Sequence, residues 1–440
     1  MNTIYALSSG AGLAAVAVVR VSGPRAGAAM AMMVGGPVPA RRAVVRRLRD
    51  PATPGEVIDE ALVLWLPGPA SFTGEDMTEF QVHGGRAVVS ALLGALSRQP
   101  GLRPAEAGEF TRRAFEAGRL DLVAVEGLAD LIAAETEAQR RQALFQQQGG
   151  ASAVFEGWRE ELLGILARHE AAIDFAEEDD VADAALRGVG ARMARLEEQI
   201  RGSLAGAERG EKIRDGVRVV IAGAPNAGKS TLLNRLAGRE AAIVSPLPGT
   251  TRDVIEVRLD LGGIAVILAD TAGLHGVGGD AIEAEGMARA RRRLAEADII
   301  VWVASPDTDA GEVHEFDSPA LRIWNKADMA LPPAHGGYDR SLAVSARSGD
   351  GIDRLLARLS DMVAERYGRS EPALVTRERQ RLALEACCNE LALARQMTGA
   401  GAELQAEHVR LAARALERLT GRIGVEELLG AIFSEFCIGK

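Results

Sequence analysis

The chain has 440 residues, which is too many for one ordinary hydrophobic core and predicts two to four domains. Its hydrophobic fraction of 47% and charged fraction of 25% are typical of a folded protein, and a formal net charge of -10 argues against a uniformly basic surface that coats nucleic acid. Three cysteines, two of them adjacent at Cys387 and Cys388, exclude a disulfide framework and a zinc-binding spacing.

No apolar run approaches the roughly 18 to 20 residues of a membrane helix. The apolar stretch near the start has no basic leader, and Arg20 interrupts it in an alternating pattern that is typical of a strand. We therefore expect a protein of the cytoplasm, with no membrane partner.

Residues 1–117 contain the strand-like runs TIYAL, AAVAVVRV, ALVLWLPG and MTEFQVHGG, together with one helical pattern around RAVVSALLGALSR. The runs end in turns rich in Gly and Pro. This mixture predicts a compact α+β domain.

Residues 118–213 change to helical periodicity, in which Trp158, Leu162 and Ile165 recur on one face. Helical patterns return in residues 369–440. Between these blocks, residues 214–368 alternate strand-like and helical runs, which predicts a mostly parallel α/β sheet. The sequence therefore predicts a multidomain α/β and α protein in which an α/β domain is inserted into a discontinuous helical domain.

The segment GAPNAGKS, Gly223 to Ser230, matches G-x-x-x-x-G-K-[ST] between a strand and a helix. Backbone N–H groups of such a P-loop surround phosphate oxygens, and the following helix N-terminus adds partial positive charge. Lys229 would reach the β- and γ-phosphates, and the Ser230 hydroxyl would bind magnesium. The inserted domain is therefore expected to have a Ras-like sheet.

Three further motifs end strands downstream: DTAG at 270–273, NKAD at 325–328 and SAR at 345–347. Asp270 can hold the magnesium shell, and the Gly273 N–H can sense the γ-phosphate. The Asp328 carboxylate can accept from guanine N1–H and the exocyclic amine, whereas adenine would leave it unpaired. An Ala346 N–H would meet guanine O6. Each motif alone could be a strand-end turn, but the four in order indicate a GTP site.

The arrangement resembles the TrmE-Era-EngA-like GTPases, a bacterial family with potassium-dependent hydrolysis. The resemblance places switch I at PGTTRDV and implies magnesium ligands Ser230 and Thr251, and potassium ligands Asn226, Ser245, Leu247 and Thr250. Asn226 could instead be a turn residue that tolerates an unusual backbone angle. The expected GTP contacts come from the P-loop, switch I and the strand-end motifs: Asn226, Ala227, Gly228, Lys229, Ser230, Thr231, Ser245, Pro246, Leu247, Pro248, Gly249, Thr250, Thr251, Asp270, Thr271, Ala272, Gly273, Asn325, Lys326, Asp328, Ser345 and Ala346.

Leu274 follows DTAG where many small GTPases have a catalytic glutamine. The resemblance assigns water activation to Glu283 in switch II, and it assigns to potassium the charge neutralisation that an arginine finger supplies elsewhere. The expected catalytic residues are therefore Glu283, Lys229 and Asn226. Glu283 could also be an exposed helix carboxylate, since Asp280 and Glu285 lie beside it.

FTGEDMTEFQVHGG at 72–85, the stretch PAEAGEF to LADLI at 104–132, and FCIGK at the end resemble the tRNA-modifying members of this family. The resemblance implies that the N-terminal domain binds a reduced folate (5,10-methylene- or 5-formyl-tetrahydrofolate) through Arg20, Glu79, Arg119 and Lys440. Cys437 would lie near that pocket, either in chemistry or as a small packing residue.

Two positions depart from the family pattern. Ser8-Ser9-Gly10-Ala11-Gly12 replaces the usual Pro-Pro-Gly-Arg-Gly, and Arg119 replaces a common lysine, which keeps the charge and changes the donor geometry.

The resemblance also implies four parts: a folate-binding and dimerisation domain at 1–117, helical segments at 118–213 and 369–440, and a GTPase domain at 214–368. It further implies a homodimer, a heterotetramer with the flavoprotein MnmG (GidA), which brings FAD and NADH, and modification of carbon 5 of the wobble uridine in tRNA. The main alternative function is a regulatory GTPase switch that binds ribosomal RNA in ribosome assembly; such proteins usually carry a compact basic RNA-binding domain, and this sequence shows none. A folate-dependent methyltransferase that uses GTP only for control is a second alternative.

Overall fold

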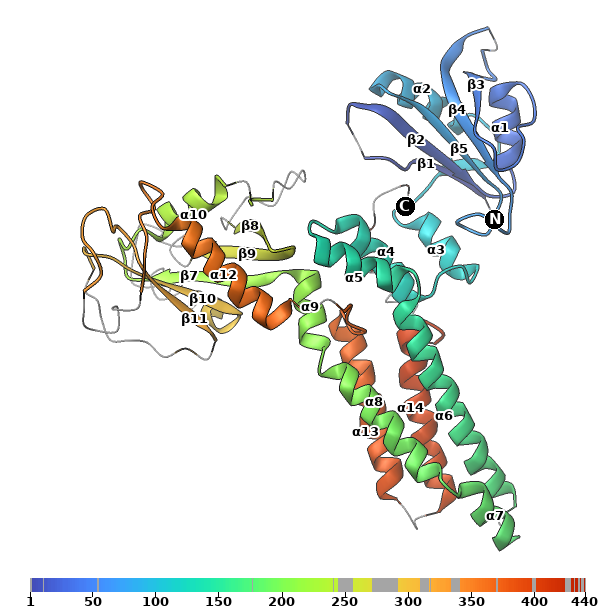
Figure 1. Ribbon diagram of the computed structural model, residues 1–440. Coiled ribbons are helices and arrows are strands. Elements are labelled where there is room, and N and C mark those ends of the chain that lie inside the picture. The colour runs from blue at the N-terminus through green and yellow to red at the C-terminus, as the bar shows by residue number, and fades with distance from the viewer. Residues whose placement is uncertain are drawn as a thin grey trace, which may run out of the picture. The chain divides into compact units, whose positions relative to one another are not determined.

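The computed structural model describes the chain except residues 1, 11, 54, 176, 240, 244–255, 271–291, 309–315, 317, 334–340, 369–370, 398–400, 424–428, 431, 434–435, 437–438 and 440. The chain forms two compact units, and Figure 1 labels their helices and strands. The first contains Met1–Ala129, Gln147–Ala167 and Val409–Lys440, and the second contains Asp130–Gln146 and Arg168–His408. None of the helices in the described ranges combines the length and the hydropathy needed to span a membrane.

A six-stranded mixed sheet forms the centre of the N-terminal part of the first unit. Its order is β3 (Val44–Arg49), β4 (Val57–Leu66), β5 (Met77–Gly84), β2 (Ala14–Ser22), β1 (Thr3–Leu7) and β6 (Leu102–Pro104). All neighbours are antiparallel except β1 and β6. The four strand-like runs of the sequence are β1, β2, β4 and β5, so the expected α+β domain is confirmed.

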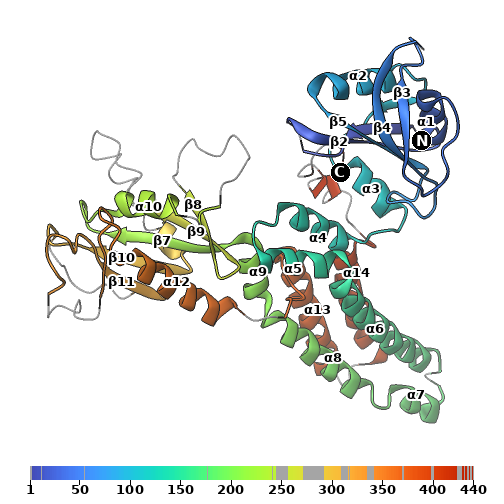
Figure 2. The ribbon, with the colours of Figure 1, turned by 45° about the horizontal axis from the view of Figure 1, so that its top comes forward.

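Three helices accompany this sheet where the sequence indicated one: α1 (Ala26–Val34), α2 (Arg86–Ser97) and α3 (Glu109–Glu116). Figure 2 shows α1 and α2 beside the strands. The sequence of α1, AGAAMAMMV, is apolar on every side, and Met30 and Met33 are buried. It therefore lacks the polar stripe by which an amphipathic helix is recognised.

The C-terminal segment packs inside the first unit. Phe433 is completely buried in a cluster with Ile432, Phe436 and two residues of α4 (Leu122–Ala133). The Ser8 hydroxyl donates to the Gly439 carbonyl at 2.8 Å. The apolar run near the chain end is thus part of a core.

Helices make up much of the remainder. They are α5 (Glu137–Gln147), α6 (Gly150–Asp174), α7 (Asp179–Leu186), α8 (Val189–Leu204), α9 (Ala207–Asp215), α13 (Glu378–Gln396) and α14 (Ala402–Thr420). The predicted face of Trp158, Leu162 and Ile165 is buried along α6. In the second unit, α8 and α13 lie side by side (Figures 1 and 2).

A second six-stranded sheet lies between α9 and α12 (Ile352–Tyr367) in the chain. Its order is β12 (Leu342–Ala343), β11 (Ala320–Trp324), β10 (Ile299–Ala304), β7 (Val217–Gly223), β9 (Ile264–Asp270) and β8 (Glu256–Leu261). Only the β8–β9 pair is antiparallel. The expected insertion of a mostly parallel sheet between helical segments is confirmed.

Helix α5 contacts both connections of this inserted sheet through one row of glutamines. Gln139 donates to the Arg214 carbonyl at 3.0 Å, at the end of α9. Gln142 both donates to and accepts from the backbone of Ala373, each at 2.7 Å, after α12. Gln146 donates to the Leu374 carbonyl at 3.0 Å. The spacing of three and four residues places the three side chains on one helix face.

Candidate nucleotide site

Two glycines set the shape of the P-loop between β7 and α10 (Lys229–Ala237). Gly223 has φ 144°, and a Cβ there would lie 2.0 Å from the Val303 carbonyl oxygen. Gly228 has φ 89°, and a Cβ there would lie 2.4 Å from Nδ2 of Asn325. Both positions therefore require glycine for backbone conformation and for close approach.

Lys229 begins α10 and is nearly buried, with 6% of its surface exposed. Its Nζ donates to the carbonyls of Gly223 and Ala224 at 2.9 and 2.8 Å. Burial lowers the pKa of Lys229, and the charge of Asp270 opposes that shift. The ammonium group is thus held across the P-loop.

Ser230 and Asp270 meet although they are 40 residues apart in the chain. The Ser230 hydroxyl donates to Oδ2 of Asp270 at 2.6 Å, at the end of β9. Arg293 donates to the Asp270 carbonyl at 2.9 Å. A hydroxyl and a carboxylate oxygen at one point are hard oxygen donors of the kind that Mg²⁺ prefers. The donor set of this chain therefore fits magnesium.

Asn325, which is 1% exposed, joins the P-loop to the SAR loop. Its Nδ2 donates to the Ala227 carbonyl at 2.9 Å, and its Oδ1 accepts from the Ala346 N–H at 3.0 Å. The sequence assigned the Ala346 N–H to guanine O6. In the structure this N–H is already bonded to Asn325, because the side chain reaches across the edge of the sheet.

Lys326 and Asp328 follow Asn325 at the same edge. The Lys326 Nζ donates to the Asn226 carbonyl at 2.8 Å and contacts Asp307. Asp328 is exposed, and a hydrogen bond from Ser345 lowers its pKa below the usual range. The NKAD motif thus contacts the P-loop at one end and the SAR loop at the other.

Asn226 adopts φ 63°, the left-handed conformation that Asn tolerates better than most residues. This geometry agrees with the turn interpretation of Asn226, whose side chain is exposed. Thr231 is exposed on the first turn of α10.

Many expected site residues lie outside the described part of the chain. They are Ser245, Pro246, Leu247, Pro248, Gly249, Thr250 and Thr251 of switch I, Thr271, Ala272 and Gly273 of DTAG, Glu283, Cys437 and Lys440.

The expected folate residues Arg20 and Glu79 form an ion pair in the first unit. They face each other across β2 and β5, with Nε and Nη2 of Arg20 at 3.0 and 2.9 Å from Oε1 of Glu79. The Arg20 guanidinium also lies over the rings of Phe72 and Phe110, at 5.6 and 5.9 Å from their centroids. A half-buried carboxylate next to aromatic rings suits a flat heterocycle with donors on one edge. Arg119 is exposed, and no hydrogen bond or ion pair joins it to this pair in the described residues.

The sequence did not reveal the two aromatic rings or the network next to them. The Arg113 guanidinium, 9% exposed, donates to Glu75 at 2.9 Å and to Glu109 at 2.9 Å. Glu109 also accepts from Arg103 at 2.6 Å. The i,i+4 spacing of Glu109 and Arg113 was the available signal, but such pairs are usually exposed.

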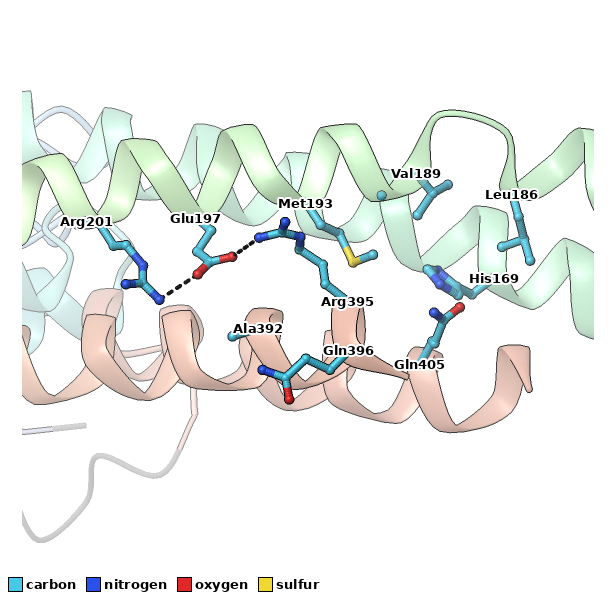
Figure 3. Close-up of a pocket in the computed structure, with 11 residues that line it drawn as sticks. His169, Leu186, Val189, Met193, Glu197, Arg201, Ala392, Arg395, Gln396 and Gln405 are labelled. Atoms are coloured by element: carbon cyan, nitrogen blue, oxygen red, sulfur yellow. Dashed lines mark hydrogen bonds and ion pairs between the residues drawn. The ribbon is translucent and has the colours of Figure 1, made fainter. Parts of the chain in front are cut away.

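A cavity of about 670 Å³ lies among helices of the second unit (Figure 3). Glu197 of α8, nearly buried, lies between Arg201 and Arg395, each at 2.6 Å. The carboxylate therefore ties α8 to α13. None of the described P-loop, NKAD or SAR residues lines this cavity.

Two family models match the chain. The model described as the N-terminus of the GTP-binding protein TrmE matches residues 3–119, and the model described as the MnmE helical domain matches residues 122–437. The chain is also similar to the G domain of the T. maritima FeoB iron transporter, at 23% identity. The match covers 35% of this chain and 99% of the G-domain chain. The TM-score of 0.25 is too low to support a conclusion.

Full-length relatives agree with the family models. The chain is 55% identical to a tRNA modification GTPase MnmE of Methylobacterium sp. (strain 4-46), over 100% of both chains. It is 53% identical to the protein of that name from Methylorubrum populi, over 100% of this chain and 98% of the relative. The P-loop, the strand-end motifs and both flanking regions are thus parts of one recognised architecture, and the chain belongs to the MnmE family of tRNA modification GTPases.

Proposed function

We propose that this protein hydrolyses GTP in the course of tRNA modification. The observation that carries the proposal is the meeting of Lys229, the Ser230–Asp270 pair and Asn325 at the carboxyl ends of the parallel strands β7, β9 and β11. Ligands of open α/β sheets bind at this edge. GTP is the substrate to which the motifs and the names of the relatives both point.

The P-loop amides and Lys229 bind the β- and γ-phosphates in this proposal. Because α10 starts at Lys229, its N-terminus adds partial positive charge at the same place. Ser230 and Thr251 would hold magnesium, with Asp270 next to Ser230, and the ion would supply charge neutralisation on the phosphates. Asp328 reads the N1–H and amine edge of guanine.

Potassium and Glu283 complete the proposed hydrolytic site. Asn226, Ser245, Leu247 and Thr250 would hold the monovalent cation, which would supply charge neutralisation at the phosphates. Glu283 orients the attacking water. The exposed position of Asn226 in the P-loop supports this assignment.

The N-terminal domain binds a reduced folate in this proposal. Glu79 accepts from the donor edge of the pteridine, while Arg20, Arg119 and Lys440 bind the rest of the ligand. The Arg20–Glu79 pair and its two neighbouring rings support the assignment, because they combine a fixed carboxylate with apolar faces. Cys437 is assigned no reaction step.

The proposed assembly follows the family. Residues 1–117 form the folate and dimerisation domain, 118–213 and 369–440 the helical domain, and 214–368 the GTPase domain of a cytoplasmic homodimer. MnmG brings FAD and NADH into a heterotetramer, and the complex modifies carbon 5 of the wobble uridine of tRNA. Nucleoside analysis of tRNA from a deletion strain tests this assignment, and an unchanged set of wobble nucleosides would contradict it.

Turnover in potassium and in sodium tests the hydrolytic site. We expect at least tenfold faster GTP hydrolysis in potassium, and loss of that difference in Asn226→Gly, because glycine keeps the left-handed backbone and removes the carboxamide. Asn234→Ala, an exposed asparagine of α10, is the matched control. If Asn226→Gly retains the full potassium effect, Asn226 is only a turn residue.

A further inference from the structure

Arg235 lies on α10, six residues after the P-loop lysine, and reaches the loop that contains the SAR motif. Its Nε donates to the Ala346 carbonyl at 2.9 Å, and its Nη2 donates to the Arg347 carbonyl. The guanidinium therefore holds two successive carbonyls of one loop. Its planar fork matches such a pair of acceptors, whereas a lysine ammonium is a single point donor.

The SAR loop is a closed turn that is tied to its surroundings at two places. Within the turn, the Ser345 N–H donates to the Asp350 carbonyl at 2.8 Å, and the Gly349 N–H donates back to the Ser345 carbonyl at 2.8 Å. From outside, Asn325 accepts from the Ala346 N–H, and Arg235 binds the carbonyls. Asn325 thus connects the SAR loop to the P-loop, and Arg235 connects it to α10.

The hydrogen bond from Arg235 to the Ala346 carbonyl also sets the direction of a backbone donor, the Arg347 N–H. A trans peptide is planar, and its N–H points opposite to its C=O. Because the Ala346 carbonyl faces Arg235 on α10, the Arg347 N–H of the same peptide points away from α10. The Ala346 N–H is bonded to Asn325, so the Arg347 N–H is the better-placed donor for the 6-oxygen of the purine.

We propose that Arg235 is a positioning residue for guanine recognition, which fixes the SAR loop so that the Arg347 N–H donates to purine O6. The proposal rests on the proposed function, since it concerns the base end of the GTP site. Helix α10 holds the phosphates at its first residue and the base-reading loop at its seventh. Arg235 thus keeps the two ends of the nucleotide site at a fixed separation.

Dissociation of a fluorescent GDP analogue from the full-length protein tests the proposal. Arg235→Met keeps the apolar stem and removes both donors, and we expect about tenfold faster dissociation, equivalent to about 1.4 kcal/mol. Arg239→Met is the matched control, because Arg239 lies just past the end of α10 and pairs at the surface with Asp353 at 3.0 Å. We expect the control to dissociate like the unaltered protein.

Binding of 6-thio-GDP separates positioning from general stability. Sulfur at position 6 is a weak acceptor, so the unaltered protein should prefer GDP by about tenfold, and Arg235→Met should lose most of that preference. The KM for GTP should rise about tenfold, with kcat at saturation within about twofold. An equal loss of affinity for both nucleotides would reveal a merely structural role and overturn the proposal.

The remaining outcomes are also decisive. If the Arg235→Met variant melts like the unaltered protein and releases GDP at the unaltered rate, the inference is wrong. If the methionine variant does not fold, Arg235→Lys takes its place, and it should retain the charge but still release GDP faster. If the unaltered protein binds no guanine nucleotide at all, the proposed function fails before this inference is tested.

Discussion

The Asp328 carboxylate is exposed at the base end of the site, and its pKa is lowered by the hydrogen bond from Ser345. It is therefore ionised at neutral pH and can accept two donors. Guanine presents an N1–H and an amine on one edge, and this pair matches a carboxylate but not an amide.

Asp328→Asn should weaken GDP binding by about a hundredfold, because charge-assisted hydrogen bonds to a ligand contribute roughly 1.5 to 3 kcal/mol each. Xanthine offers a carbonyl where guanine has its amine, so the variant should bind xanthosine diphosphate better than GDP. Calorimetric titration measures both. Asp353→Asn, at an 83% exposed side chain, should change neither affinity and provides the control. If Asp328→Asn binds GDP with the original affinity, Asp328 does not recognise the guanine base.

Motif spacing could predict Lys229, Ser230, Asp270 and Asn325, because each belongs to a short sequence motif that lies at or just after the end of a strand. The Arg20–Glu79 ion pair could not be predicted in the same way. It depends on the register between β2 and β5, and a shift of one residue would put the two side chains on opposite faces. Arg235 gave no local signal, since an arginine inside a helix is usually exposed.

The sequence predicted some elements of the N-terminal domain and missed others. Helix α2 has a polar and an apolar side, whereas α1 is apolar throughout. Strand β3 was missed because it carries Arg46 and Arg47 on opposite faces. It lies at the edge of its sheet, where charged residues on both faces are tolerated.

The C-terminal segment is an element whose packing can be measured. Phe433 is completely buried against α3 and α4 residues, with its ring 5.2 Å from the Arg112 guanidinium. Phe433→Ala should lower the free energy of unfolding of the first unit by about 3 to 5 kcal/mol, the usual range for a buried Phe.

Calorimetry of the full-length protein measures this loss. Ile423→Ala, at a residue that is 44% exposed, should cost less than about 1 kcal/mol and provides the control. Equal melting of Phe433→Ala and the unaltered protein would mean that the C-terminal segment does not contribute to this core.

At the scale of the whole molecule, the order of parts followed from the sequence, but the division into compact units did not. Residues 130–146 were expected in the first helical segment, and they belong to the same unit as the inserted sheet. One long-range contact within that unit is the hydrogen bond between Gln142 and Ala373, which are 231 residues apart. No local pattern encodes such a pair.

The buried network of the first unit should make its stability depend on acid. Burial opposes ionisation of Glu109, but hydrogen bonds from Arg103, the Glu106 N–H and Arg113 hold its pKa at about 2, against 4.5 ordinarily. The folded-state pKa is depressed, so the stabilisation is present above about pH 4.5 and is lost as the pH falls toward 2.

Glu109→Gln should therefore melt earlier than the unaltered protein at pH 7, by an equivalent of about 2 to 3 kcal/mol, with the difference shrinking below pH 4.5. Melting curves of both proteins between pH 3 and 7 measure this. Glu60→Gln, at a side chain 60% exposed, should leave the curve unchanged. A difference that does not vary with pH would contradict the role of the charge.

The glutamine row of α5 limits how this architecture can vary among related chains. A carboxamide reaches a backbone carbonyl only over about 3 Å, so one inserted or deleted residue near Arg214 or Ala373 would carry that carbonyl out of range. Insertions and deletions in related sequences should accordingly avoid these two connections and collect in surface loops instead. The length of each connection is as constrained as the identity of the glutamine that bonds to it.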